Sequence, residues 1–154
     1  MANLFSAIAL RANGQRILHG WFDALRLAGV DIENYLGAGY IAETSVSLAN
    51  NASAADVTGL IVDKSLYRSA FVHVEVRRKT DSNEAVAVGM LNLLYKVNTD
   101  AWEVIPVLNG DGEEDGAGTI FSITSAGQVR AATDNMSGSN YVGTIKFKSM
   151  TFSA

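Results

Sequence analysis

The sequence contains no cysteine, one proline and two histidines among its 154 residues. Without cysteine, disulfides, thiolate catalysis and cysteine-based zinc sites are excluded, so stability has to come from burial or from contacts between subunits. Charge is also sparse: charged residues make up 18% of the chain, and the formal net charge is −4. The densest basic run, Arg77-Arg78-Lys79, is typical of the solvated end of a strand. Because non-specific nucleic-acid binding needs a basic face, nucleic acid is not expected as a partner.

Long apolar runs are missing too. No run approaches the about 20 consecutive apolar residues that cross a bilayer, so membrane insertion is not expected. Residues 3–11 lack the basic start and the long apolar stretch of a secretory signal. The rest of the composition is that of an ordinary globular chain, with 48% hydrophobic residues in a length close to that of one domain. We therefore expect a single hydrophobic core.

The first 39 residues have the periodicity of a helix. Apolar residues recur there at intervals of three and four, on one stripe: Leu18, Trp21, Phe22, Leu25 and Ala28. Asn13 is a suitable N-cap and Gly29 a suitable C′ residue, so a helix is predicted over residues 14–28. A stripe of this size has to lie against another surface. The helical N-terminal arm, residues 1–39, is therefore predicted to carry an assembly interface formed by Leu18, Trp21, Phe22 and Leu25.

After residue 40 the period changes to two. Val72, Val74 and Val76 alternate with other residue types, and short alternating segments follow up to residue 147. Clusters of turn-forming residues separate them at positions 80–83, 98–100, 109–118, 125–127 and 134–139. Pro106 indicates an edge strand or a strand boundary. Short strands at such intervals favour an antiparallel β-sandwich or jelly-roll-like domain over an α/β sheet. The chain is thus predicted to be mainly β, with this domain over residues 40–154.

No set of catalytic residues can be assembled from the sequence. His19 falls in the predicted helix and His73 in a predicted strand, and no third group is placed to orient either ring. The G-x-S-x-G nucleophile elbow and the glycine-rich phosphate loops do not occur. A small hydrolase or lyase is the alternative, but the constellation that it requires is missing. The prediction is a protein that is not an enzyme and has no catalytic residues.

One loop concentrates negative charge. Residues 110–116 include four carboxylates within five positions: Asp111, Glu113, Glu114 and Asp115. Calcium takes six to eight oxygen ligands from loops of this kind, so a structural calcium ion is one interpretation. The spacing differs from that of an EF-hand, and a solvated connection between two strands is the other interpretation. We expect the second, with no metal site and no cofactor.

The aromatic residues admit two interpretations. Stacked aromatic rings on a sheet can form a platform for sugars. Trp102, however, lies in an alternating apolar run, which favours burial in the core. Tyr40, Tyr67 and Tyr141 adjoin predicted turns and are placed to reach a partner. A glycan-binding module therefore stays open as a second hypothesis.

Several blocks of residues, in a fixed order, resemble a module that recurs in tailed-bacteriophage virion proteins, notably fibre and tail-appendage proteins. The blocks are NNASAADVTG at residues 50–59, RSA at 68–70, the glycine and acid loop, and FSITSAGQV at 121–129. Similar modules often continue with an aromatic residue and a serine–threonine pair, where this chain has Arg130-Ala131-Ala132. The opening at residues 10–15, with Trp21-Phe22 and residues 25–29, also resembles the start of small phage structural proteins.

This resemblance implies a non-enzymatic virion structural protein, located in the virion as a fibre or tail-appendage component. Its partners would be copies of itself and other phage structural proteins. Because phage appendages and surface proteins are usually symmetric oligomers, a homotrimer is expected. The alternatives are a capsid decoration or cement protein, and a host-attachment module that binds a host surface glycan.

Overall fold

The computed structural model describes residues 41–110 and 116–154, and every structural statement below concerns these residues. The predicted arm with Leu18, Trp21, Phe22 and Leu25 lies outside them, as do Asp111, Glu113, Glu114 and Asp115, so those predictions stay untested. The described residues form one short 3-10 helix, η1 (Val97–Thr99), and the strands β1 (Ile41–Ser47), β2 (Ala55–Ile61), β3 (Tyr67–Lys79), β4 (Glu84–Lys96), β5 (Ala101–Gly110), β6 (Thr119–Ile123), β7 (Gln128–Thr133) and β8 (Val142–Ser153). The prediction of a mainly-β chain is confirmed.

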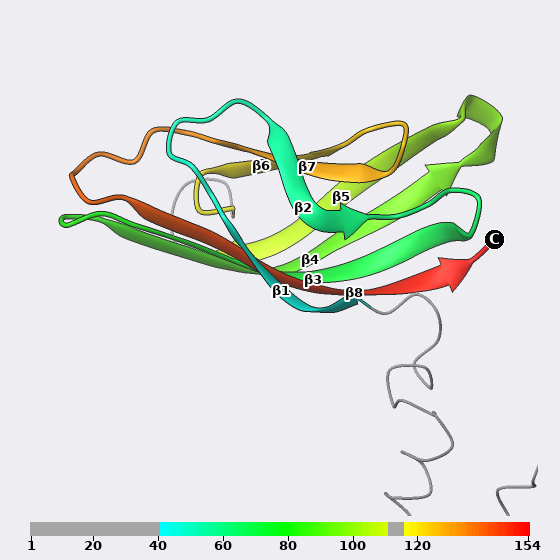
Figure 1. Ribbon diagram of the computed structural model, residues 1–154, viewed down its shortest axis with the longest axis horizontal. Coiled ribbons are helices and arrows are strands. Elements are labelled where there is room, and N and C mark those ends of the chain that lie inside the picture. Colours follow the sequence, from blue (N-terminus) through cyan, green and yellow to red (C-terminus); the bar gives the residue numbers. More distant parts are fainter. Residues whose placement is uncertain (1–40, 111–115) are drawn as a thin grey trace, which may run out of the picture. The chain divides into compact units, whose positions relative to one another are not determined.

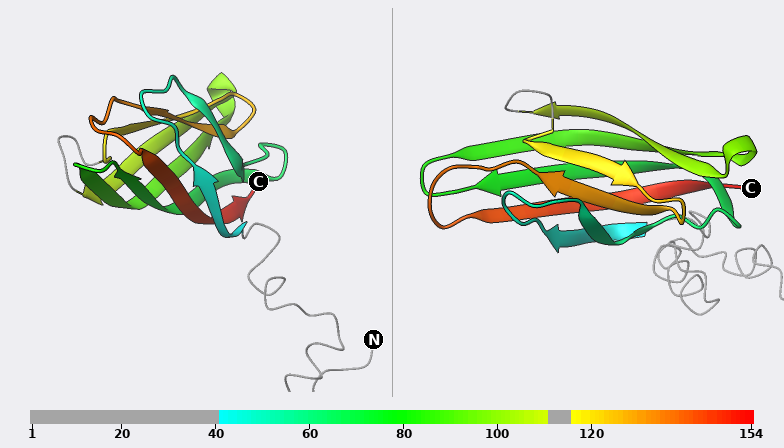
Figure 2. Two further views of the ribbon diagram at one scale, coloured as in Figure 1. Left: turned by 60° about the vertical axis from the view of Figure 1, so that its left-hand side comes forward. Right: turned by 90° about the horizontal axis from the view of Figure 1, so that it is seen from above.

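The strands form two antiparallel sheets. One has five strands in the order β1-β8-β3-β4-β5, and the other has three in the order β2-β7-β6. In Figure 1 the smaller sheet lies above the larger one, and the view from above in Figure 2 shows it covering part of the same face. The five-stranded sheet thus has an inner face toward the smaller sheet and an outer face away from it.

The hairpin of β3 and β4 is the centre of the large sheet. Its register is continuous from Ser69 opposite Leu94 to Lys79 opposite Glu84. The turn that joins the two strands begins at Thr80, whose backbone N–H donates to the carbonyl of Asn83 at 2.8 Å, as the turn-forming residues predicted. Alternate residues of β3 are buried and exposed along nearly its whole length, as the period of two predicted. The hairpin therefore presents one face to the core and one face outward.

The core lies between the two sheets. The five-stranded sheet contributes buried side chains from β3, β4 and β8, and the three-stranded sheet contributes side chains from each of its strands: Val72, Val74, Val76, Leu91, Leu93, Ile145 and Phe147 from the first, and Val57, Leu60, Phe121, Val129 and Ala131 from the second. Trp102 is 7% exposed, so the prediction that it is a core residue is confirmed. Pro106 lies within β5, which is an edge strand and continues past the proline to Gly110.

The smaller sheet unites blocks that are far apart in the sequence. Residues 55–59 lie in β2, and residues 121–129 form most of β6, the tight turn and the start of β7. Gly127 has φ of 85°, and a Cβ there would overlap the carbonyl oxygen of Val62, so glycine is required by both conformation and space. The pairing of β2 with β7 shifts between Asp56 and Ile61, and the Gln128 side chain spans this irregularity by donating to the carbonyls of Val57 and Leu60 at 3.0 and 3.1 Å.

One interpretation of the sequence needs correction. The basic run was interpreted as solvated, but Arg78 is only 1% exposed, because position 78 continues the inward series of Val72, Val74 and Val76. Within the described residues no helix is long and apolar enough to cross a membrane.

Candidate functional site

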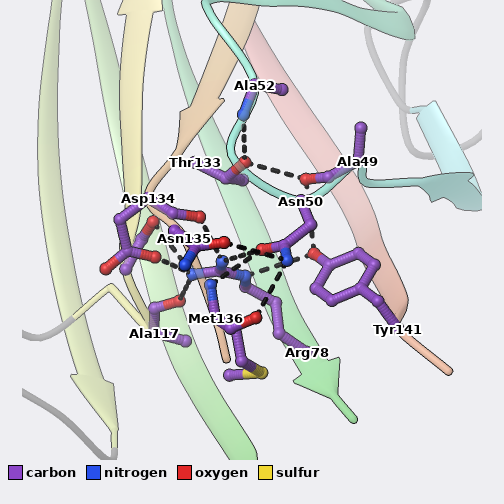
Figure 3. Close-up of polar contacts among 11 residues, drawn as sticks. Ala49, Asn50, Ala52, Arg78, Ala117, Thr133, Asp134, Asn135, Met136 and Tyr141 are labelled. Carbon is purple, nitrogen blue, oxygen red and sulfur yellow. Dashed lines mark hydrogen bonds and ion pairs between the residues drawn. The ribbon is translucent and has the colours of Figure 1, made fainter. Parts of the chain in front are cut away.

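One end of the molecule is organised around Arg78, near the end of β3. Figure 3 shows its guanidinium surrounded by oxygen atoms from three loops. The Nε–H donates to the Tyr141 hydroxyl at 3.2 Å, and one Nη–H group donates to the carbonyl of Ala117 at 2.8 Å. The other acceptors are the Gly118 carbonyl, the Asn50 Oδ1 atom, and both the carboxylate and the backbone carbonyl of Asp134. We call these residues the Arg78 cluster.

Electrostatics favour the charged form of Arg78. Burial lowers the pKa of the guanidinium, but the hydrogen bonds to Asp134 and Tyr141 outweigh burial and raise that pKa above its ordinary value. The Asp134 side chain is 65% exposed, so the ion pair joins a buried cation to a solvated anion. Hydrogen bonds to six acceptors compensate the guanidinium for the water that it lost.

The loops around Arg78 are also tied to one another. Asn50 accepts from the Met136 backbone N–H at 2.8 Å and donates from Nδ2 to the Met136 carbonyl at 2.9 Å. The Thr133 hydroxyl donates to the Ala49 carbonyl at 2.8 Å and accepts from the Ala52 N–H at 3.0 Å. The Tyr141 hydroxyl donates to the carbonyl of Ala49 at 3.3 Å. These contacts join the loop between β1 and β2 to the ends of β7 and β8.

The Arg78 cluster fixes loops in place. Its donors and acceptors are used within the chain, and the guanidinium stays protonated throughout the accessible pH range. Its neighbours are carbonyls, an amide, a phenol and one solvated carboxylate. The arrangement is therefore suited to fixing the shape of this end of the molecule.

The second region is the outer face of the five-stranded sheet, where apolar side chains are exposed across four adjacent strands. They are Met150 and Phe152 on β8, Phe71 on β3, Val88, Met90 and Leu94 on β4, and Ile105 and Val107 on β5. We call these eight residues the outer patch. Met90 is half-buried and the other seven are exposed, from 39% for Leu94 to 58% for Val88.

The strand register makes the outer patch continuous. Phe71 lies opposite Met150 on one side and opposite Asn92 on the other, and Asn92 lies opposite Ile105. The next row places His73 beside Met90, which in turn lies opposite Val107. The rings of Phe71 and Phe152 meet edge to face with centroids 5.4 Å apart. The apolar side chains therefore form a band that crosses the sheet from β8 to β5, with the polar residues Asn92 and His73 lying within it.

Charged residues occupy the rest of the outer face, toward the hairpin turn. Lys146 and Lys148 lie on β8, with Lys146 opposite Glu75 of β3. Arg77 and Glu84 form an ion pair at 2.8 Å across β3 and β4. His73, one of the two histidines considered for chemistry, is exposed on this face between Met90 and Lys148. The outer face thus has an apolar half and a charged half.

A third polar group lies around Asp100, which follows η1. Asp100 Oδ1 accepts from Lys64 Nζ and from the Tyr95 hydroxyl, both at 2.5 Å. The hydrogen bond from Lys64, then the one from Tyr95, lowers the pKa of Asp100. The guanidinium of Arg68 lies over the Tyr95 ring, 5.3 Å from its centroid. All these side chains reach solvent, so water competes for each contact.

The remaining residues that the sequence analysis singled out are three tyrosines and one histidine. Tyr67 and Tyr141 are both half-buried, and the Tyr141 hydroxyl belongs to the Arg78 cluster. Tyr40 and His19 lie outside the described residues. Among the residues that the structure describes, no three histidine, aspartate or glutamate side chains are close enough together to hold a metal ion.

Comparisons with known proteins give little. No protein-family model matches the chain, and no curated protein matches it. Among solved structures, the chain is similar to the tailspike protein of Acinetobacter phage vB_ApiP_P1, with a TM-score of 0.34 and 17% sequence identity over 75% of this chain. The matched region is 20% of the tailspike chain, so this chain spans about a fifth of that protein's length.

Proposed function

We propose that this chain is a non-enzymatic structural component of a bacteriophage particle, a fibre or tail-appendage protein that assembles as an oligomer and most simply as a homotrimer. The observation that carries the proposal is the outer patch. An apolar patch that extends over several strands of one face often marks an interaction site. The inner face of the same sheet already fills the core, so the fold itself does not require apolar residues on the outer face.

The bacteriophage part of the proposal rests on the resemblance of the sequence blocks to virion proteins. In the fold these blocks have structural roles. Asn50 belongs to the Arg78 cluster, Asp56 accepts from Arg130 Nε at 3.1 Å, and Gln128 bridges the irregular strand β2. These contacts give the blocks structural roles within one fold, and their resemblance to virion proteins is what supports the bacteriophage part of the proposal. The two-sheet arrangement is compatible with the β-sandwich expected for it.

The test is the composition of the particle. Particles of the phage that carries this sequence are purified and analysed by quantitative mass spectrometry, and the chain is then located in the particle by cryo-electron microscopy. We expect the chain in the particle, in a copy number divisible by three, at the tail. Density on the capsid surface would replace the fibre or appendage role by that of a capsid decoration protein. Absence from the particle would overturn the proposal.

A glycan-binding role is the alternative that this experiment leaves aside. The purified full-length chain is therefore also applied to a glycan array and to host cells. We expect no binding, as the purely structural role requires. Specific binding of one class of glycan would instead assign host attachment to the chain.

A further inference from the structure

We propose that the outer face of the five-stranded sheet is the surface on which a second copy of this chain docks, with the outer patch at the centre of the contact. The inference rests on the proposed function, since it names the surface through which the proposed oligomer forms. It deepens that function by committing to one partner, which is a second copy of this chain.

The size of the face fits a stable contact between protein subunits. Five strands spaced about 4.8 Å apart are about 19 Å wide, and the 13 residues of β3 extend for about 43 Å. The face therefore measures roughly 800 Å², which is the area that each partner contributes to a standard protein–protein interface. The outer patch alone, from β8 to β5 and over four rows of residues, is roughly 300 Å² between backbone positions. The outer patch is therefore large enough to be the apolar centre of an interface, and the rest of the face would have to form the rim.

The residues around the outer patch supply such a surround. Interfaces between subunits have an apolar centre and a polar, solvated rim. Here the rim includes charges of both signs: Lys146 and Lys148 on β8, the pair of Arg77 and Glu84 near the hairpin turn, and Glu103 on β5, which pairs with Lys96 at 2.6 Å. The rim therefore offers charges of both signs to a second copy of this chain.

The shape of the face favours another sheet as the partner. Sheets pack face to face about 10 Å apart when alternate side chains from both can interdigitate. The outer patch offers branched and aromatic side chains at alternate positions of four strands, which is the surface that such packing needs. In the described part of the chain the three-stranded sheet packs on the inner face, which leaves the outer face open to the sheet of another copy.

The experiment uses the full-length chain and two double variants that are matched in type. Val88→Lys with Val107→Lys places two cations in the outer patch, on β4 and the edge strand β5. Ile61→Lys with Ile120→Lys places two cations at exposed apolar positions of the three-stranded sheet, with Ile120 on the edge strand β6. Self-association is measured by sedimentation velocity over a range of concentrations, and circular dichroism establishes that each variant is folded.

We expect the outer-patch variant to self-associate about a hundredfold more weakly than the unaltered chain, because two buried cations would lack partners in the contact. The control variant should self-associate like the unaltered chain. A milder variant, Val88→Thr with Val107→Thr, keeps the side-chain shape and the preference for β structure, so it retains the test if lysine prevents folding. Its self-association should be weakened in the same direction.

A second measurement reports on the face directly. Met150 is 47% exposed in one copy, so peroxide should oxidise it readily in a monomer and slowly in the oligomer. Unchanged self-association in the outer-patch variants would overturn the inference. A monomeric unaltered chain would overturn it as well. Fast oxidation of Met150 in that monomer would mean that the outer face is open, and slow oxidation would mean that something other than a second copy covers it.

The failures of the two proposals are distinguishable. A chain that is present in the particle but keeps its oligomer in the outer-patch variants would retain the proposed function and lose this inference. A chain that dissociates in those variants but is absent from the particle would retain the inference and lose the bacteriophage role.

Discussion

Strand β3 carries two regions that meet opposite requirements. Its inward series ends in Arg78, a charge inside the protein, while its outward series begins with Phe71, an apolar ring at the surface. The charge is supplied with partners by the chain itself, since six oxygen acceptors surround the guanidinium. The ring lies beside Phe152, Met150 and Asn92 and is still 40% exposed. The first region is complete within one chain, and the second gains from an additional partner.

This difference predicts where a substitution acts. Changes in the Arg78 cluster should lower the free energy of unfolding of a single chain. Changes in the outer patch should leave that free energy almost unaltered and act on association. The predictions below separate the two regions, in order of decreasing effect on stability.

The largest effect is expected for Arg78→Met, which keeps much of the side-chain volume and removes the donors. The Ala117 carbonyl would lose the donor that Arg78 supplies, and a buried acceptor left without a hydrogen bond costs about 1–3 kcal/mol. The carbonyls of Gly118 and Asp134 would lose one donor each but still accept from the backbone N–H groups of Asp134 and Asn51. We expect the free energy of unfolding to fall by roughly 2–4 kcal/mol in urea titrations, because several hydrogen bonds to a charged group are lost while the remaining anion, Asp134, is solvated.

Arg77→Met is the matched control, because Arg77 is exposed on the opposite face of the same strand. A change within about 0.5 kcal/mol is expected there. Equal losses in the two variants would contradict the special role of the buried guanidinium.

A smaller effect is expected for Tyr141→Phe. The phenol accepts from Arg78 Nε at 3.2 Å and donates to the Ala49 carbonyl at 3.3 Å, and both contacts are lost while the ring remains. The expected loss is about 1 kcal/mol, the net value of a typical hydrogen bond. In the background of Arg78→Met the same substitution should cost less, because one of its partners is already gone. A double-mutant cycle measures this coupling, and strict additivity would argue against one shared network.

The Arg78 cluster also illustrates what the sequence could and could not reveal. The inward direction of Arg78 follows from the spacing of Val72, Val74 and Val76, because position 78 continues the same alternation. Its acceptors were not available, because Asn50, Ala117 and Asp134 come from loops brought together only by the pairing of distant strands. The turn at residues 80–83, by contrast, depends on neighbouring residues and was predicted correctly.

The outer patch escaped prediction for a different reason. Strand β4 has apolar residues in both phases of its alternation: Ala87, Leu91 and Leu93 point inward, whereas Val88 and Met90 point outward. A strand that alternates between two apolar sets does not indicate from sequence which set is buried. The decision comes from the register with β3, where Val76 and Val72 lie opposite Ala87 and Leu91. The sequence therefore identified the strand and the fold class, while the exposed face depended on pairing.

Little effect on stability is expected for Val88→Thr in the outer patch. Val88 is 58% exposed in one copy, and threonine keeps the branched shape that suits a strand. We expect the unfolding free energy to change by no more than about 0.5 kcal/mol in dilute solution, where the chain is least associated. Val72→Thr, on the buried face of β3, should instead cost about 1–3 kcal/mol because its hydroxyl would be buried. A large loss for Val88→Thr would place this residue in a core and contradict the exposed outer patch.

The smallest effect on stability is expected at Asp100, whose ion pair with Lys64 lies at the solvent-exposed surface. The hydrogen bonds from Lys64 and Tyr95 lower its pKa in the folded state, so the carboxylate contributes stability above the unfolded pKa and loses it as the pH falls through the folded pKa. Lys64→Met removes the larger cause, and the pKa of Asp100 should rise toward its ordinary value of 3.8. Carbon-detected NMR titration of the side-chain carboxyl measures this directly.

The same substitution should leave the self-association of the chain unchanged, because Lys64 and Asp100 lie outside the outer patch. An unchanged pKa of Asp100 in the Lys64→Met variant would mean that water screens this pair completely, and a change in self-association would extend the docking surface beyond the outer face of the sheet.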